Sequence, residues 1–356
     1  MPSTRSLRAS KPNAASGVFR VVVINLGILF VLVVVAELVF GHWLSGPQYG
    51  AMNLARNVDR YFDTANLYEG GNRIHYSLDE NGLRGTYSDP SKIHILTIGG
   101  STTKQLYIDD RETWQTRLQD LFAVAGQPAT VVNAAVDGQS TRGHIAVFDL
   151  WFPQIPNLRA QHVLAYVGIN DVTVSGSSID RLDYSSIWKR LKFDSALVRL
   201  WRTVVGMWQA ERARLNHSAI DFRAASWTDR PGHAAAKIPD VGPYKERLKA
   251  MAGLIRAMGA EPVFITQSRG DAMMIDGRLQ GLAGADGLNG LDEHGVLAGF
   301  NAATMQVCGE LKISCADLAH EIGFEIGDFY DRIHNTPDGA EKIGRWLAGK
   351  VGPLLK

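Results

Sequence analysis

From Ile93 onward, short apolar runs rich in β-branched residues alternate with amphipathic segments of helical period, and this alternation constrains the fold most. Residues 112–126 and 244–259 carry apolar residues at helical spacing, and each segment ends at a glycine, a common helix stop. Several of the short runs are almost continuously apolar, as expected of parallel strands covered on both faces. Together these segments predict a three-layer α/β/α domain with a doubly wound parallel sheet over residues 91–356. The runs with strand length are residues 93–99, 130–135, 162–168, 262–267 and 312–318.

One long stretch, residues 173–240, interrupts the alternation between the third and fourth predicted strands. Inside it, residues 188–214 (WKRLKFDSALVRLWRTVVGMWQAERAR) carry seven Lys or Arg against two acids, with an apolar stripe at helical spacing. We expect a helical insertion that packs on the domain and keeps its basic face in water. A substrate lid and a helix lying on a membrane surface are the alternatives. Residues 270–296, rich in Gly and Asp, are expected to form a loop.

A separate apolar run precedes this domain. Residues 21–40 (VVVINLGILFVLVVVAELVF) are long enough to cross the roughly 30 Å hydrocarbon core of a bilayer. A cleaved signal peptide and a buried helix are the alternatives, but we find no convincing cleavage site and the run is apolar all round. Since the preceding residues are basic, the positive-inside rule predicts a cytoplasmic tail (1–20), a transmembrane signal-anchor helix (21–43) and an extracytoplasmic linker and entry segment (44–90). The chain is thus expected in the plasma membrane, with its large domain outside, in the periplasm of a bacterial host.

Net charge, motifs and the surroundings of the cysteines argue against binding of nucleic acid, nucleotides and zinc. The formal net charge of +1 creates no field that would favour nucleic acid. Neither GxGxxG nor a P-loop pattern occurs at the strand–helix turns, so nucleotide binding has no support. Cys308 and Cys315 have no nearby histidine, which argues against zinc. Outside the membrane they form either a disulfide or two buried thiols. We expect no metal and no cofactor.

Ser101 follows the first predicted strand, in the stretch ILTIGGSTTKQ. Taken alone, this stretch fits a glycine-rich turn with Ser or Thr as a helix N-cap. A nucleophilic serine also needs a base and a group that orients the base. Asp331 and His334 lie three residues apart just before the last predicted helix, close enough for the carboxylate to reach the imidazole. His144 and His294 are the other candidate bases, but they lack such a companion.

Two further loops supply candidate oxyanion donors. Gly138 follows the second predicted strand, in NAAVDGQST, where its backbone N–H can point into a site. Asn170 follows the third strand, in YVGINDV, where a side-chain amide can bind a developing oxyanion. Ordinary loop and turn roles are the alternatives, with Asp171 as a turn residue or a support for Asn170. Ligands of doubly wound sheets bind at this carboxyl edge, which favours a shared site.

Taken in this order, the GGST, NAAVDGQST, GIND and DRIHNTPDG blocks resemble those of the SGNH (GDSL-type) hydrolase superfamily. The resemblance covers about residues 93–351, with a gap at the insertion. The upstream NGLRG block (residues 81–85) is similar to that of the membrane-anchored bacterial branch, and we expect its arginine, Arg84, to be structural. The chain departs from the pattern at Gly100, where the family often has Asp.

This resemblance implies a flavodoxin-like SGNH fold and a named set of catalytic residues. Ser101 would be the nucleophile, His334 the base and Asp331 its orienter. The backbone N–H groups of Ser101 and Gly138, with the Asn170 amide, would form the oxyanion hole.

The implied activity is that of a serine esterase or deacylase acting on acyl esters, O-acetyl esters among them. An O-acyltransferase acting on a cell-surface polysaccharide is an alternative, because similar triads serve such enzymes. A non-catalytic, membrane-tethered binding or assembly subunit is another. The expected partners are an acyl-ester substrate, such as an acetylated glycan, and the membrane. The sequence fixes neither the acyl length nor the oligomeric state.

Overall fold

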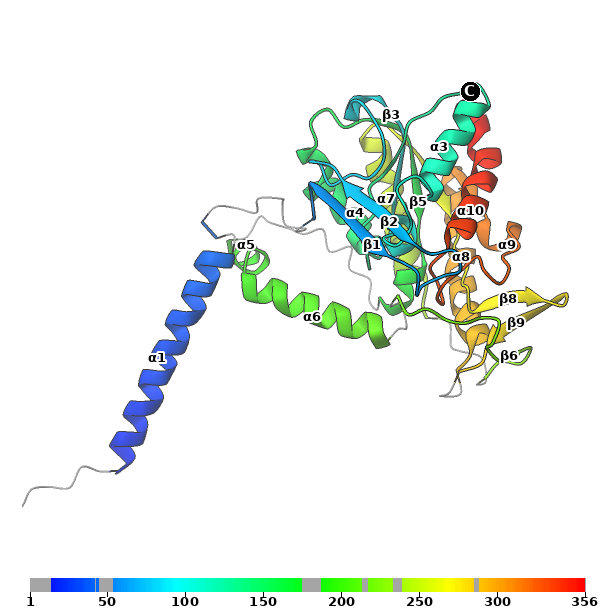
Figure 1. Cartoon of the computed structure of the whole chain (residues 1–356). Helices are drawn as coiled ribbons and strands as arrows, with labels where there is room; N and C mark the ends of the chain where they lie inside the picture. Colours follow the sequence, from blue (N-terminus) through cyan, green and yellow to red (C-terminus); the bar gives the residue numbers. More distant parts are fainter. Residues whose placement is uncertain are drawn as a thin grey trace, which may run out of the picture. The chain divides into compact units, whose positions relative to one another are not determined.

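The computed structural model describes residues 14–41, 43–44, 54–174, 187–212, 217–232, 239–284 and 288–355 (Figure 1). These residues belong to two compact units, one of Met1–Gln48 with Tyr184–Val204 and one of Tyr49–Asp183 with Val205–Lys356. Most of the predicted basic tail lies outside the described residues. Parts of the predicted linker and of the predicted insertion lie outside them as well.

The first unit contains α1 (Ala14–Phe40), α5 (Ile187–Phe193) and the beginning of α6 (Ala196–Arg212). From Gly17 to Phe40, α1 is long and apolar enough to cross a membrane. The single helical segment predicted at 188–214 is wrong in one respect, because the structure divides it into α5 and α6. The Ser195 hydroxyl between them accepts a hydrogen bond from Val198 N, which is how a serine starts a new helix.

The second unit is built on a five-stranded, wholly parallel sheet in the order β10-β7-β5-β3-β4. Numbered along the chain, this order is 2-1-3-4-5, that of flavodoxin-like folds, so the predicted fold is confirmed. All five predicted strands are present, and four are shorter than or offset from the predicted ranges. The strands are β3 (Ile93–Gly99), β4 (Val131–Asn133), β5 (Ala160–Tyr166), β7 (Glu261–Ile265) and β10 (Ser314–Ala316).

Helices cover both faces of this sheet. The pair α3 (Trp114–Val124) and α10 (Pro337–Val351) packs on one face, while α4 (Thr141–Leu150), α7 (Gly242–Ala257) and α8 (Gly290–Leu311) cover the other (Figure 1). Strand β3 contributes side chains to the hydrophobic cores on both faces of the sheet. Leu96 and Ile98 pack on the α4 side, whereas Ile95, which directly precedes Leu96, packs on the other side with Trp114 of α3. This alternation follows from the two-residue period of a strand.

Two small antiparallel sheets were not predicted. The range predicted as a linker, 44–90, contains the hairpin β1 (Val58–Asp63) and β2 (Arg73–Leu78). The loop expected at 270–296 is wrong, because this range contains β8 (Ala272–Ile275) and β9 (Arg278–Leu282), with β6 (Trp227–Thr228) beside β9. Asp276 and Gly277 join β8 to β9 with φ of 50° and 75°. An Asp-Gly pair with positive φ is a strong hairpin signal, and it identifies this turn.

Short helices complete the second unit. They are η1 (Pro90–Lys92), α2 (Ser101–Lys104), η2 (Phe152–Gln154), η3 (Ile169–Thr173), α9 (Leu318–Glu321) and η4 (Gly352–Leu355).

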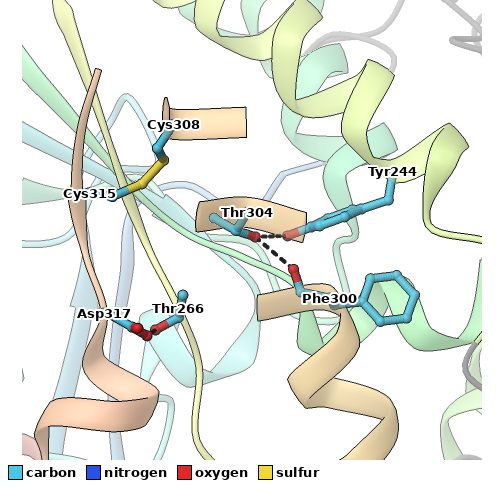
Figure 2. The surroundings of a disulfide bond; sticks show 7 residues. All are labelled: Tyr244, Thr266, Phe300, Thr304, Cys308, Cys315 and Asp317. Atoms are coloured by element: carbon cyan, nitrogen blue, oxygen red, sulfur yellow. Dashed lines mark hydrogen bonds between the residues drawn. A yellow bond between two sulfur atoms is a disulfide. The ribbon is translucent and has the colours of Figure 1, made fainter. Parts of the chain in front are cut away.

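The two cysteines form a disulfide between α8 and β10, which decides between the two alternatives left by the sequence (Figure 2). The Cα atoms of Cys308 and Cys315 are 6.2 Å apart. One turn earlier on α8, Thr304 Oγ1 lies 2.8 Å from the Tyr244 hydroxyl of α7. These contacts attach α8 to its neighbours on that face of the sheet.

Candidate active site

Ser101 is the first residue of α2, directly after the carboxyl end of β3. Two glycines precede it because there is no room for a Cβ atom. A Cβ on Gly99 would lie 2.0 Å from Thr103 Oγ1, and one on Gly100 would lie 2.2 Å from Asn170 Nδ2. The chain therefore turns tightly at this point, and the serine is held at the sheet edge with only 6% of its surface exposed.

His334 joins Ser101 to Asp331 through hydrogen bonds at both ring nitrogens. Its Nε2 lies 2.7 Å from Ser101 Oγ, and its Nδ1 lies 2.6 Å from Asp331 Oδ2. The other carboxylate oxygen of Asp331 accepts from the backbone N–H groups of Ile333 and His334, at 2.9 and 2.7 Å. The short loop before α10 is thus fixed by the same carboxylate that holds the ring. All three side chains are buried.

The other two candidate bases have different surroundings. His144 is buried on α4, with Nδ1 3.2 Å from Gln139 Oε1, and burial lowers its pKa to about 3. The pKa of His294 is lowered by burial and by Arg269. The hydrogen bond to Ser101 is made by His334.

Besides Ser101 itself, the other two predicted oxyanion donors follow the neighbouring strands. Asn170 is in η3, after β5, and its Nδ2 donates to the Gln139 carbonyl at 2.9 Å. Gly138 directly precedes Gln139 in the loop after β4 and has a φ of 68°, which favours glycine. Because β3 and β5 flank the point where the strand order reverses, Ser101 and Asn170 occupy the usual ligand-binding crevice of such sheets.

A buried ion pair supports these two loops, and sequence reasoning missed it. Asp171 accepts hydrogen bonds from Thr141 N at 3.1 Å, from Thr141 Oγ1 at 2.5 Å and from Arg247 Nη2 at 3.1 Å. The side chains of Asp171 and Arg247 are each 1% exposed. Arg247 lies in a helical pattern where a charged residue is normally on the surface, so no sequence signal indicates its burial. The pair links α7 to the loops that carry Gly138 and Asn170.

Gln267, just after β7, is a second missed support. Its Nε2 donates to Thr102 Oγ1 at 2.9 Å, and its Oε1 accepts from Ile169 N at 2.7 Å. Thr102 and Ile169 are the neighbours of Ser101 and Asn170, so one buried amide fixes the spacing of the two strand ends.

A second histidine stacks on the first. The His217 ring lies 4.0 Å from the His334 ring, at 21° to it, and its Nδ1 is 2.6 Å from the Tyr330 hydroxyl. Burial and then the neighbouring His334 lower the pKa of His217 to about 4. His217 is therefore neutral at pH 7 and adds no positive charge beside His334. It lies in the insertion, more than a hundred residues from His334, and nothing in the sequence indicated this contact.

The two stacked histidines and Asp331 form the one group of potential metal ligands among the described parts of the chain. Donor atoms of His217, Asp331 and His334 all lie within 4.8 Å of one another. However, imidazole lone pairs lie in the ring plane, and two stacked, nearly parallel rings do not direct them at one point. Both ring nitrogens of His334 also have hydrogen-bond partners. The hydrogen bonds of His334 to Ser101 and Asp331 therefore explain this cluster better than a bound metal ion does.

Arg84 has the structural role expected from the sequence. Its buried guanidinium donates to the carbonyls of Lys104, Gln105 and Ile108, at 2.6, 2.8 and 2.6 Å, and to Asp110 at 2.6 Å. It thereby holds the loop that follows α2.

A small cavity lies beside the serine, and Tyr330 lines both this cavity and a larger groove whose lining does not include Ser101. The cavity beside Ser101 has a volume of about 10 Å³, roughly room for one water molecule. It is lined by Ser101, Thr102, Gln105, Tyr107, Ile108, Tyr330, His334 and Asn335. The groove has a volume of about 970 Å³ and a mostly polar lining, with Tyr68, Glu112, Arg223 and Asp338 among its residues.

Residues 97–342 match the family described as GDSL-like Lipase/Acylhydrolase. The chain belongs to this family. It is thereby assigned to a group of ester-hydrolysing enzymes, as the resemblance in the sequence predicted. No curated protein sequence matches the chain significantly.

Several solved structures resemble the chain at low sequence identity. TesA is 16% identical with a TM-score of 0.42, over 73% of this chain and 99% of TesA. The esterase EstA from Pseudoalteromonas sp. is 12% identical with a TM-score of 0.40, over 74% and 98%. A catalytic mutant of an acetylxylan esterase from Geobacillus stearothermophilus is 14% identical with a TM-score of 0.42, over 73% and 96%.

Proposed function

We propose that this protein hydrolyses acyl esters with Ser101 as nucleophile, His334 as general base and Asp331 as the group that orients the base. The observation that carries this proposal is the unbroken hydrogen-bonded series from Ser101 Oγ through His334 to Asp331, with steps of 2.7 and 2.6 Å. A serine hydroxyl becomes a useful nucleophile when a neighbouring base accepts its proton.

In the first half of the reaction, Ser101 Oγ attacks the ester carbonyl carbon while His334 Nε2 takes the hydroxyl proton. Asp331 holds the Nδ1 proton and stabilises the imidazolium that forms. The imidazolium then gives its proton to the departing alcohol, which leaves an acyl-enzyme on Ser101. In the second half, water attacks the acyl-enzyme with the same base, and Ser101 recovers its proton as the acid is released.

The negative oxygen of each tetrahedral intermediate needs donors on the opposite side from the base. We assign this role to the Asn170 amide and to the backbone N–H groups of Ser101 and Gly138. The nearness of Asn170 Nδ2 to Gly100 supports its part in the assignment, because it brings the amide next to the backbone of the nucleophile. Such donors are each worth about 2.7–4 kcal/mol in the transition state.

We further propose that the acyl group is short. The cavity of about 10 Å³ beside Ser101 supports this, because the buried rings of Tyr330 and His334 leave little room for a long chain. The acetyl group is the acyl group that suits such a space best.

The polar groove beyond Tyr330 supports a glycan as the rest of the substrate. Carboxylates, amides and an arginine line it together with Tyr68 and Phe222, and sugar rings bind through such hydrogen-bonding groups and aromatic faces. A sugar hydroxyl in this groove would also serve as acyl acceptor, which keeps an O-acyltransferase as the second candidate.

We place the chain in the membrane-anchored bacterial branch of its family. In this proposal α1 spans the plasma membrane with its N-terminus in the cytoplasm, and the hydrolase domain (91–356) with its insertion (173–240) lies outside. The apolar length of α1 and the basic residues before it support this orientation. Retention of the full chain in membranes after alkaline extraction, with protease access to the domain from outside only, is the expected result.

The function is tested by comparing wild type with Ser101→Ala on aryl esters of increasing acyl length and on acetylated glycans. We expect wild type to prefer acetyl over octanoyl esters and Ser101→Ala to lose activity on all of them. Scoring the acyl group in the medium against its appearance on a second glycan separates hydrolysis from transfer. A folded wild type that releases no acyl group from any ester would favour a binding or assembly subunit.

A further inference from the structure

Within the first unit, the end of α1 is hydrogen-bonded to the beginning of α6. Glu37, one turn before α1 ends, is buried, and its carboxylate accepts from Ser195 Oγ at 2.6 Å. It also accepts from the backbone N–H groups of Ala196 at 2.7 Å and Leu197 at 3.1 Å. The first N–H groups of a helix lack intrahelical partners and favour a negative charge. Glu37 therefore fixes the first turn of α6 at the depth of the last turn of α1.

Two more contacts determine which side of α6 faces away from the apolar span of α1. Arg199 Nη2 donates at 2.5 Å to the Phe40 carbonyl, the last in α1. Helix carbonyls point toward the C-terminus, so this one points out of the apolar span. The indole of Trp43 donates to the Leu191 carbonyl of α5 at 2.8 Å. The beginning of α6, with α5, thus lies beside the end of α1 (Figure 1). Because Arg199 binds the last carbonyl of α1, the side of α6 that carries it faces away from the span.

The opposite face of α6 is a row of large apolar side chains at helical spacing. Each is between 43% and 69% exposed. Arg199, Arg202 and Thr203 lie on the other side of the helix. Water is a poor environment for so continuous an apolar row, and such rows normally contact a partner. The row consists of Leu197, Leu200, Trp201, Val204, Met207 and Trp208.

We infer that α6 lies on the membrane surface where α1 ends, with this apolar row in the boundary between headgroups and acyl chains. Three observations support lipid over other occupants. The helix begins at the end of a segment that can span a membrane, its outward side carries Arg199, and tryptophans stand in and next to the row. Basic helices with Trp and Leu on one face bind at this depth and favour anionic lipids.

The inference is tested with an environment-sensitive fluorophore on single added cysteines in the full chain. Val204→Cys places the label in the apolar row, and Thr203→Cys places it on the neighbouring residue of the other face. The two native cysteines are paired in the disulfide and do not compete for the label. Each labelled chain is reconstituted into vesicles of phosphatidylcholine and phosphatidylglycerol, with and without brominated acyl chains, and its circular dichroism spectrum is compared with that of the unlabelled wild type as a check on folding.

We expect the label at position 204 to emit at shorter wavelength and to be quenched by brominated lipid, and the label at position 203 to show neither effect. Equal exposure of both labels to water would overturn the inference. So would a label at 204 that is shielded from water yet unquenched, since protein, a second copy or the folded domain, would then cover the row. Equal quenching at both positions would also contradict a helix with one face in the membrane. Each outcome is independent of whether Ser101 is the nucleophile.

Discussion

Asn170 Nδ2 lies so close to Gly100 that a Cβ atom on residue 100 would be 2.2 Å from it. The position of the Asn170 amide, the proposed oxyanion donor, therefore leaves room only for glycine at residue 100, where the family often has Asp. We expect Gly100→Ala to push the Asn170 amide out of place and to lower kcat by about 100-fold, with a smaller change in KM. Steady-state kinetics on an aryl acetate measure this effect.

A matched control for that substitution is Gly253→Ala. Gly253 is exposed on α7, and a Cβ there would meet no atom within 4 Å. This variant should retain wild-type kinetics and gain about 0.5–1 kcal/mol of stability, because Ala favours a helix over Gly. Equal loss of activity in both variants would mean that the effect at Gly100 is not local.

Removing the amide itself gives the second prediction. Asn170→Ala should lower kcat by roughly 100- to 1,000-fold with little change in KM, since the donor acts mainly in the transition state. If Gly100→Ala acts through Asn170, the double variant should be no slower than Asn170→Ala alone. Fully additive losses would refute the link between the two residues.

The buried pair of Arg247 and Asp171 gives a prediction about stability. Arg247→Met leaves a buried carboxylate without its cation, and we expect the free energy of unfolding to fall by about 3–5 kcal/mol. Urea unfolding measures this loss. Arg256→Met, at an exposed position on the same helix, is the control and should change stability by about 0.5 kcal/mol or less. Similar values for the two variants would show that the pair has no special importance.

The stacked His217 predicts how stability depends on pH. Because burial and His334 lower its pKa from 6.5 to about 4, folding keeps this ring neutral. The stability linked to this ring is fully present above pH 6.5. It is lost as the pH falls toward 4, because the unfolded chain binds a proton there and the folded chain does not. His217→Phe keeps a stacking ring without this proton, so its urea-unfolding free energy should fall less steeply over that window. Parallel pH curves for the two proteins would contradict the assigned pKa.

Much of the fold was predictable because its signals are local. Continuous apolar runs predicted all five strands of the parallel sheet, and helical periodicity with terminal glycines predicted α3 and α7. The hairpin of β8 and β9 was missed because glycine and aspartate were interpreted as loop composition rather than as a turn between two strands. The break between α5 and α6 was missed because Ser195, which caps α6, lies inside a basic segment that reads as one helix. The hydrogen bond from Ser195 to Glu37 joins residues more than 150 positions apart, so the sequence could not indicate it.

In the candidate site, too, the residues with a local sequence signal were predictable and those that depend on distant contacts were not. Ser101, Gly138, Asn170, Asp331 and His334 each follow a predicted strand or precede a predicted helix, so position and residue type together indicated them. Their supports gave no such signal. Arg247, Gln267 and His217 act through contacts between elements distant in sequence, and a buried arginine in an amphipathic pattern resembles a surface residue until the helix is placed.

The central claim is that Ser101 is the nucleophile, and covalent labelling tests it most directly. The full chain is treated with a fluorophosphonate and digested, and the modified peptide is identified by mass spectrometry, with Ser101→Ala and His334→Ala as comparisons. The account predicts one adduct, on Ser101, that is absent in Ser101→Ala and strongly slowed in His334→Ala. An adduct on another residue, or undiminished ester hydrolysis by folded Ser101→Ala, would contradict it.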